Sequence, residues 1–544
     1  MAARLPLLAA FLAILAAGAA GAVLYLRVAG DEPAPILQTS RYTEGVAGTW
    51  QRVNPLFATV NDVDQDLAQL VFSGLLKIGP DGRVAPDLAA DLPQVSEGGR
   101  VYTFTLRDDV RWHDGEPFTA ADVLFTVESI QASGFRGEAS LAALWDDVEA
   151  HAPDAHTVVF RLPEPNAPFL VRNATIGIIP AHRLAELSPA QLYEAPFNVA
   201  PVGTGPYRLN TLAAGEAELA AYGDYHFGRP GIRELRLRFY SDYSAALRGI
   251  ERGDIEGLFI RPIPDEDQIA WIDDLSDVSV DTPQRAAHVV VYLNNDAAAF
   301  FRDPRVRQAV ALAIDREALV DDVFQGFATP SSSPIPPGSW AYAEDFEVPP
   351  STALDAAAEL LDEAGWELHA TSGTRVRLGS EFRLTIRTDT DPRRLAVAQA
   401  IAAQLEPLGI RANVASTSFP VLRRDFLQER RYEVAVAGWD QGADPDPYFA
   451  WHSSQMGTAG LNIANYSDPV ADRLIEEARR TADMSVREDM YYQFQEIWDR
   501  TAPSIVIAYP RFTYIRSDRI EGGVPGFLPA PHLRFTNIHE WRRS

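Results

Sequence analysis

YTFTLRDDVRWHDGEPFTAADVLFTVESI, residues 102–130, passes from an alternating strand pattern through a tight turn into a capped helix. Alternation over 101–112 predicts a strand, and the apolar spacing of 119–131, with Thr119 as N-cap, predicts a helix. His113 and Asp114 between them could suggest a metal or acid/base site. The run HDGEP is more typical of a turn that leads from a strand into a helix. The stretch therefore predicts mixed α/β structure with no chemistry of its own.

The composition describes a folded, acidic chain of more than one domain. It has 544 residues, 47% of them hydrophobic, which is too long for one core and predicts two or three domains. The formal charge of −27 argues against nucleic acid as a partner, because polyanions are repelled. Cysteine is absent, which excludes disulfides, thiolate metal sites, Cys nucleophiles and a lipid-bearing Cys.

The N-terminus carries an export signal. Residues 5–26 are uncharged, and as a helix they would extend about 33 Å, enough for a hydrocarbon core of about 30 Å. The alternative to a membrane-spanning helix is a cleaved signal peptide, since AGA at 20–22 resembles a cleavage site. Because apolar residues continue past it, we expect 1–27 to be an uncleaved anchor in the inner (cytoplasmic) membrane. The remainder would be periplasmic or extracytoplasmic, and secreted if the segment is cleaved.

A second α/β stretch follows from the strand pattern at 288–295. Its apolar spacing and caps predict several helices, at 303–324, 351–365, 391–410 and 468–480. A strand pair at 504–518 could rejoin the first part of the chain. The sequence thus predicts two α/β parts whose crossing points lie near 285–290 and 505–510.

Five stretches in order resemble one family, the extracytoplasmic solute-binding proteins of peptide-type ABC importers, which includes oligopeptide-, dipeptide- and nickel-binding proteins. They are NPLFATVNDVDQDLAQLVFSGLLKIGPDGRVAPDLAADL (54–92), the opening stretch (102–130), PVGTGPYRL (201–209), YLNNDAAAFFRDPRVRQAVALAIDRE (292–317) and GWDQGADPDPYF (438–449). The resemblance extends from about residue 37 to 540.

The resemblance implies an α/β fold, a two-lobed periplasmic-binding-protein-like clamp of type II with an elaborated first lobe. On this basis we expect a linker at 28–36, lobe I at 37–287 with an extra subdomain at about 81–195, lobe II at 288–507, and a C-terminal return to lobe I at 508–544. Such a clamp closes by a hinge around its ligand.

The function that the resemblance implies is capture of a di- or oligopeptide between the lobes and delivery to an ABC permease with its ATPase subunits. The other expected contact is with the membrane, through the N-terminal segment, and the protein is expected to be a monomer. Two alternatives stay open: a sensor that presents its ligand to a receptor, and a binder of a non-peptide solute such as an oligosaccharide or a metal chelate. No G-x-S-x-G, H-E-x-x-H or Walker motif is present, so neither an enzyme nor a cofactor is expected.

The loop GWDQGADPDPYF is the candidate for ligand binding. A calcium site is disfavoured because Gln455 stands where an EF-hand has its bidentate Glu, and zinc is disfavoured because His452 is alone. In peptide binders that this sequence resembles, an Asp of this loop pairs with the ligand's α-ammonium. Asp444 and Asp440 are the candidates, Asp444 preferred, with Trp439 and Tyr448 as apolar walls. Alternatively, the carboxylates cap backbone N–H groups of a rigid turn.

Further cleft residues are implied by the resemblance. Asn61 follows the first strand, and Phe259 lies between Leu258 and Ile260 at a strand end that contacts ligand in relatives. The remaining candidates are Tyr292 and Asn294 in the crossing strand, and Arg393 and Arg394 for a ligand carboxylate.

Overall fold

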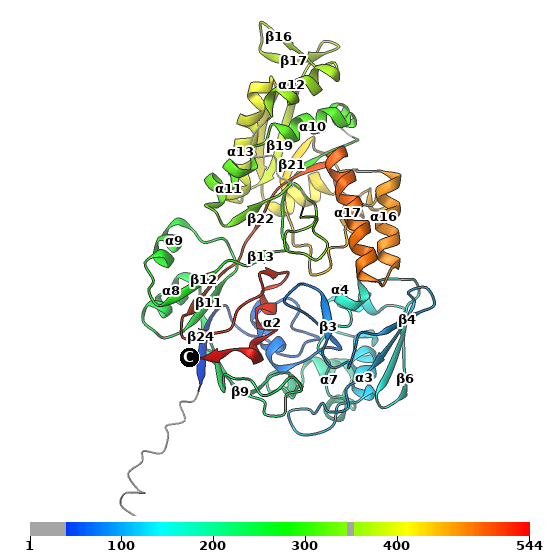
Figure 1. Ribbon diagram of the computed structural model, residues 1–544, viewed down its shortest axis with the longest axis vertical. Coiled ribbons are helices and arrows are strands. Elements are labelled where there is room, and N and C mark those ends of the chain that lie inside the picture. The colour runs from blue at the N-terminus through cyan, green and yellow to red at the C-terminus, as the bar shows by residue number, and fades with distance from the viewer. Residues whose placement is uncertain (1–39, 297, 345–352) are drawn as a thin grey trace, which may run out of the picture.

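Two β-sheets of similar size form the two lobes of the computed structural model, which describes residues 40–296, 298–344 and 353–544 (Figure 1). The sheet of the lower lobe in Figure 1, lobe I, has seven strands in the order β12 (Val278–Asp281), β23 (Thr513–Ser517), β11 (Gly257–Ile260), β1 (Arg41–Ala47), β10 (Glu234–Tyr240), β9 (Glu216–Ala221) and β8 (Tyr207–Leu212). β1 is parallel to β10 and β11, and the other pairs are antiparallel. β23 brings the C-terminal part of the chain back into this sheet.

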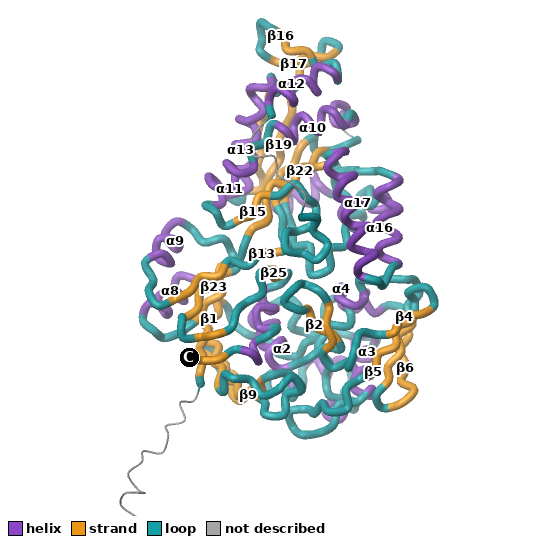
Figure 2. Tube along the Cα trace, viewed as in Figure 1, coloured by secondary structure: helices purple, strands orange, loops and turns teal. Residues whose placement is uncertain are grey.

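The sheet of lobe II has six strands, in the order β15 (Ala328–Pro330), β22 (Ser504–Pro510), β14 (Val289–Leu293), β21 (Val434–Ala437), β19 (Arg383–Asp389) and β20 (Arg411–Thr417). Helices cover both faces (Figure 2). On one side are α10 (Pro304–Leu312), α11 (Arg316–Phe324), α12 (Leu354–Glu363) and α13 (Pro392–Leu405); on the other are α16 (Pro469–Arg480) and α17 (Met484–Thr501). β14 and β21 are buried along their whole length, as expected for central strands of a covered sheet. A small sheet at the far end of lobe II contains β16 (Glu367–His369), β17 (Thr374–Arg377) and β18 (Ser380–Glu381).

An additional four-stranded sheet enlarges lobe I. It consists of β4 (Gln94–Ser96), β5 (Val101–Thr105), β7 (Thr157–Arg161) and β6 (Glu149–Asp154). α3 (Ala120–Gln131) packs on β6 and β7, and Trp145 of α4 (Ala139–Trp145) packs on Phe160 of β7 with ring centroids 5.5 Å apart. The predicted helix at 119–131 is confirmed: the Thr119 N–H donates to Asp122 Oδ2 at 3.0 Å. The predicted strand at 101–112 ends earlier, at Thr105, because its partner β7 begins opposite that residue.

The remaining lobe I elements surround its main sheet. They are α2 (Asp62–Val71), β2 (Leu76–Ile78), β3 (Val84–Pro86), α8 (Tyr243–Glu251), α9 (Glu266–Asp273) and the C-terminal 3-10 helix η6 (Pro531–Phe535). α2 and η6 pack together. Arg534 of η6 fixes this contact: its guanidinium donates to Asp66 of α2 at 2.6 Å and to Glu44 of β1 at 2.8 Å, with all three side chains buried.

The HDGEP turn is confirmed as a structural element. The Gly203 N–H donates to His113 Nδ1 at 3.2 Å, and His113 Nε2 lies 3.0 Å from the Gly205 carbonyl. Burial lowers the pKa of His113 to about 4, so the ring is neutral and can accept at Nδ1 while donating at Nε2. The turn therefore holds the segment that leads into β8.

Two crossing segments join the lobes and lie beside each other. The chain passes from lobe I to lobe II through β13 (Gln284–Arg285) into β14, and returns after β22 into β23. The Phe512 N–H donates to the Pro283 carbonyl at 3.0 Å, and Gln284 Nε2 donates to the Tyr509 carbonyl at 3.2 Å. A paired connection of this kind is the arrangement about which two lobes can hinge.

The predicted membrane anchor, residues 5–26, lies outside the described residues. Within the parts of the chain that the structure describes, no helix combines the length and the apolar character needed to cross a membrane.

Candidate ligand site between the lobes

The loop 438–447 leaves β21 and runs along the first crossing segment. The Gln441 N–H donates to the Ala286 carbonyl at 2.7 Å, and the His288 N–H donates to the Trp439 carbonyl at 3.3 Å. Gly438 permits this approach, since a Cβ at that position would lie 2.0 Å from the His288 carbonyl oxygen. The loop is thereby fixed at the junction of the two lobes.

Three cavities lie beside this loop or the residues directly after it, and each draws residues from both lobes. One of about 190 Å³ is lined by Arg172 of lobe I and, from lobe II, by Trp439, Asp440, Asp446 and Phe449. A second, of about 550 Å³, lies between α4 and the segment after β7 in lobe I and α16 in lobe II, and Tyr448 lines it. A third, of about 290 Å³, lies in lobe I and is lined at one point by Ala443. Of the predicted residues, Asp440, Trp439 and Tyr448 therefore do lie against interlobe cavities.

Asp440 is the accessible carboxylate of the loop. Its side chain is 49% exposed and forms a two-pronged ion pair with Arg285, at 2.8 and 2.9 Å. Arg285 also lies 5.3 Å from the centroid of the Phe512 ring, so the pair spans the two crossing segments. A solvent-exposed pair of this kind contributes little to stability and can exchange partners.

Asp444 occupies a different environment from the one expected. Its carboxylate is fully buried and accepts three hydrogen bonds from Arg487 of α17, between 2.9 and 3.2 Å. Its Oδ1 also accepts from the Asp446 N–H at 3.1 Å. Burial lowers the pKa of Arg487, but the Asp444 carboxylate raises it by more, so that this pKa lies above its usual value. The prediction that Asp444 meets a ligand does not fit this placement, because its oxygens are committed to holding the loop on α17.

Asp446 is the third carboxylate of the loop and, like Asp444, is buried. Its Oδ1 accepts from the Tyr448 N–H at 3.1 Å, and its Oδ2 lies 3.3 Å from Arg479 and 3.7 Å from Arg172. Burial raises the pKa of Asp446, against the lowering effect of Arg479. The alternative that the loop carboxylates cap backbone N–H groups thus describes part of what Asp444 and Asp446 do.

Aromatic rings form the floor beneath the loop. Trp439 stacks on Tyr292 with ring centroids 5.3 Å apart, and Tyr292 stacks on Trp451 at 5.9 Å. Tyr448 stacks on His452 at 4.6 Å, with the Arg479 guanidinium 4.1 Å from its ring centroid. Tyr292 is fully buried, so it supports Trp439 from below.

The other predicted residues are engaged within the framework. Asn61 caps α2, accepting from the Val63 N–H at 3.0 Å and donating to the Thr49 carbonyl at 2.8 Å. Phe259 packs against Phe512 at 4.9 Å.

Asn294 is buried and donates to the Arg430 and Tyr432 carbonyls, each at 2.9 Å. Arg394 pairs with Asp389 at 2.8 Å, whereas Arg393 donates across the lobes to the Pro264 carbonyl at 2.8 Å. The arrangement thus commits these side chains to protein partners.

Four arginines that lie at this junction were not among the site residues predicted from the sequence: Arg172, Arg285, Arg479 and Arg487. Their partners lie far away in the sequence, and surface arginines are too common to single out in an Arg-rich chain. Arg172 and Arg479 both line the interlobe cavity of about 550 Å³. The lobes also meet where the Ala167 N–H donates to the Arg479 carbonyl at 2.7 Å and where Arg83 of lobe I pairs with Glu488 of α17 at 2.8 Å. Figure 1 shows α4 and β4 next to the ends of α16 and α17.

In the described parts of the chain, no group of three or more His, Asp or Glu side chains is placed to hold a metal ion. The arrangement at the junction is instead one of stacked rings, paired charges and cavities that both lobes line. It is suited to enclosing an organic ligand.

Comparison with known proteins places the chain in a family. Residues 83–460 match the family model described as bacterial extracellular solute-binding proteins, family 5 middle. The oligopeptide-binding protein AppA of Bacillus subtilis is 28% identical over 500 residues, covering 90% of this chain and 89% of AppA. The dipeptide-binding protein of Escherichia coli is 28% identical, covering 85% of this chain and 87% of that protein. The structure of AppA in complex with a nonapeptide is similar with a TM-score of 0.62 and 26% identity, covering 93% of this chain and 99% of AppA. The chain belongs to the bacterial extracellular solute-binding proteins of family 5.

Proposed function

We propose that this protein is the substrate-binding component of an ABC importer, and that it captures di- or oligopeptides between its lobes and delivers them to a permease. The observation that carries the proposal is the junction itself, where a loop fixed on the crossing segment is flanked by cavities that both lobes line. Two relatives of nearly the same length are named for oligopeptide and dipeptide binding. On this proposal the protein binds and releases its ligand without transforming it.

The domain boundaries of this proposal are those expected from the sequence: 37–287 for lobe I, 288–507 for lobe II and 508–544 for the return. The start of β14 at Val289 supports the first boundary. β22 runs in the lobe II sheet to Pro510, which favours a second boundary between Pro510 and the start of β23 at Thr513. We further propose that the protein is a monomer held at the membrane by residues 5–26, with the permease and its ATPase subunits as partners.

For the ligand contacts we propose Asp440 as the carboxylate that meets a positive end of the peptide. Its exposure and its exchangeable partner Arg285 support this role. Trp439 and Tyr448 provide flat surfaces for peptide groups. Asn61, Phe259, Tyr292, Asn294 and the two arginines 393 and 394 would act mainly by holding these walls in position.

The experiment is isothermal titration of the full chain, in a mild detergent, with an alanine pentapeptide, combined with mass spectrometry of molecules that co-purify. We expect saturable binding of the pentapeptide and co-purified peptides that are released on denaturation. An oligosaccharide or a metal chelate as the co-purified molecule, together with no heat of binding for the peptide, would contradict the proposal.

A further inference from the structure

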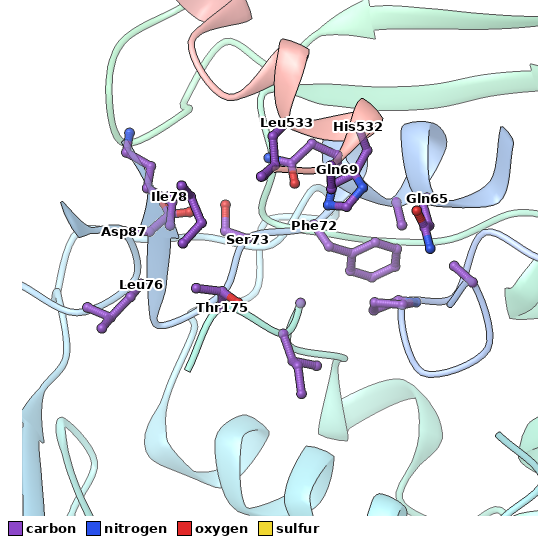
Figure 3. Close-up of a pocket in the computed structure, with 18 of the residues that line it drawn as sticks. Gln65, Gln69, Phe72, Ser73, Leu76, Ile78, Asp87, Thr175, His532 and Leu533 are labelled. Carbon is purple, nitrogen blue, oxygen red and sulfur yellow. The ribbon is translucent and has the colours of Figure 1, made fainter. Parts of the chain in front are cut away.

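The third cavity has a chemical character of its own. It lies in lobe I and is enclosed by α2, by β2 with the turn before it, and by η6 (Figure 3). Gln65 and Gln69 come from α2, Phe72 and Ile78 from the following segment, and His532 from η6. Its volume of about 290 Å³ far exceeds the space of one water molecule and is near the lower end of small-ligand pockets.

The cavity borders the candidate ligand site. Ala443, in the middle of the loop 438–447, is part of its wall, although the other lining residues belong to lobe I. Ala443 packs against the lobe I core. A ligand lying along the loop could therefore extend a side chain into this space.

Most of the wall is apolar. Ala68, Phe72, Leu76 and Leu533 are buried residues of the lobe I core that also line the cavity. Burial of an apolar group against such a wall is favourable in proportion to the area removed from water.

The charged groups of the wall have partners. Asp87 Oδ1 lies 2.7 Å from His226 Nε2, and Lys77 Nζ lies 3.7 Å from the centroid of the Phe227 ring. Burial lowers the pKa of Lys77, which reflects a site that disfavours additional unpaired charge. A charged ligand group would enter this space without a counter-ion of its own.

Neutral hydrogen-bonding groups are present as well. The Gln69 amide has no hydrogen bond to another described residue. Burial, and to a smaller extent the positive charge of the nearby Arg534, lowers the pKa of His532 to about 4, so its ring is uncharged at neutral pH. His532 Nδ1 is buried without a partner in the described parts of the chain. A neutral imidazole donates at one nitrogen and accepts at the other, and a Gln amide donates through its NH₂ group and accepts at its oxygen.

We infer that this cavity receives an uncharged, mainly apolar side chain of the bound ligand, with Gln69 and His532 as its hydrogen-bonding partners. The inference rests on the proposed peptide-binding function and adds a preference to it. The pocket favours an aromatic ring with one hydroxyl over a charged side chain, because the wall offers apolar area and neutral polar groups together.

The test is a side-chain scan by isothermal titration of the full chain. The probes are an alanine pentapeptide and versions with Tyr, Phe, Glu or Lys at each position in turn. At one position at least, Tyr should bind about tenfold or more tighter than Ala, from the apolar area that it buries, and Glu and Lys should bind no tighter than Ala. Phe should lie between Ala and Tyr.

Two variants connect the preference to this cavity. Ala68→Phe fills the space and should remove the Tyr advantage while the unsubstituted pentapeptide still binds. Gln69→Leu is the milder change, at a partly exposed position, and should abolish the preference for Tyr over Phe. Ser467→Phe, which lines a different cavity in lobe II, is the matched control and should leave all the ratios unchanged.

The outcomes separate the inference from the function. Peptide binding in which Tyr is never preferred, or in which Glu or Lys equals Tyr, overturns the inference and leaves the proposed function standing. The same conclusion follows if Gln69→Leu and a folded Ala68→Phe both retain the wild-type ratios. Absence of binding for every probe overturns the proposed function and this inference with it.

Discussion

Replacing Asp444 with asparagine tests whether this carboxylate holds the loop or meets the ligand. The change keeps the shape of the side chain and removes its charge. Arg487 then remains buried, with its side chain 4% exposed, and loses the anion that its guanidinium contacts at 2.9–3.2 Å. Loss of one member of a buried ion pair is among the costliest single substitutions in a protein.

The magnitude follows from the geometry. Two charges about 4 Å apart interact by about 4 kcal/mol at an effective dielectric constant of about 20. Removal of one partner from a buried pair costs about 3–5 kcal/mol, which is the same size. In an unfolding unit of about 200 residues this corresponds to a drop of about 6–20 °C in Tm. We therefore expect Asp444→Asn to shift the transition that contains lobe II by several degrees at least.

The assay is thermal unfolding followed by circular dichroism, combined with titration of one pentapeptide in free-amine and N-acetylated forms. Asp444→Asn should lower Tm and, at a temperature where it is folded, should not change the ratio of the two affinities. Asp440→Asn is the matched control for stability, since its exposed pair should cost less than about 1 kcal/mol. The reasoning is refuted if Asp444→Asn leaves Tm within about 2 °C of the parent and selectively weakens the free-amine peptide.

Three further predictions concern the junction. Asp440→Asn should weaken a free-amine pentapeptide by about fivefold and leave its N-acetylated form unchanged in titration calorimetry; equal losses would remove Asp440 from the ligand's positive end. Burial lowers the pKa of His288 to about 3, so its neutral form supports the fold above pH 6.5 and this support declines as pH falls. The free energy of unfolding should fall by about 2 kcal/mol between pH 7 and pH 5. Denaturant titrations at the two pH values should show a smaller fall in His288→Asn than in the parent, and an equal fall in both proteins would contradict this. Gly438→Ala should cost about 1–3 kcal/mol in the same titrations, because its Cβ meets the His288 carbonyl, whereas Gly215→Ala, with open space around it, should cost less than about 1 kcal/mol; equal costs would contradict the close approach.

The fold was predictable from the sequence because its signals are local. Thr119 and Asp122 form a capping box that can be recognised in the sequence, and the strand pattern at 288–295 contains β14. The two-lobed arrangement was predicted from the five stretches that resemble the solute-binding family, in their order along the chain. The spacing of apolar residues alone predicts helices and strands but not how they are arranged in two lobes. The end of β5 at Thr105 was missed because a strand ends where its partner ends, and that partner lies some fifty residues away.

The candidate site was only partly predictable. The loop 438–447 was identified by its composition, and Trp439, Asp440 and Tyr448 do line cavities at the junction. Both Asp440 and Asp444 pair with an arginine of another element, and the choice between them depends on which of the two pairs is buried. Arg487 lies on α17 and Arg285 on the crossing segment, and no local pattern in the sequence distinguishes a buried arginine from an exposed one.

The pairing of all three loop carboxylates has a consequence for recognition. Asp440, Asp444 and Asp446 each face an arginine, so the loop adds little net charge to the junction even though the whole chain carries −27. A ligand with charged ends must displace Arg285 from Asp440, and that exchange replaces one exposed ion pair by another at small net gain. Affinity must then come mainly from apolar burial against Trp439, Tyr448 and the cavities beside them. This balance favours peptides selected by side-chain area over peptides selected by terminal charge.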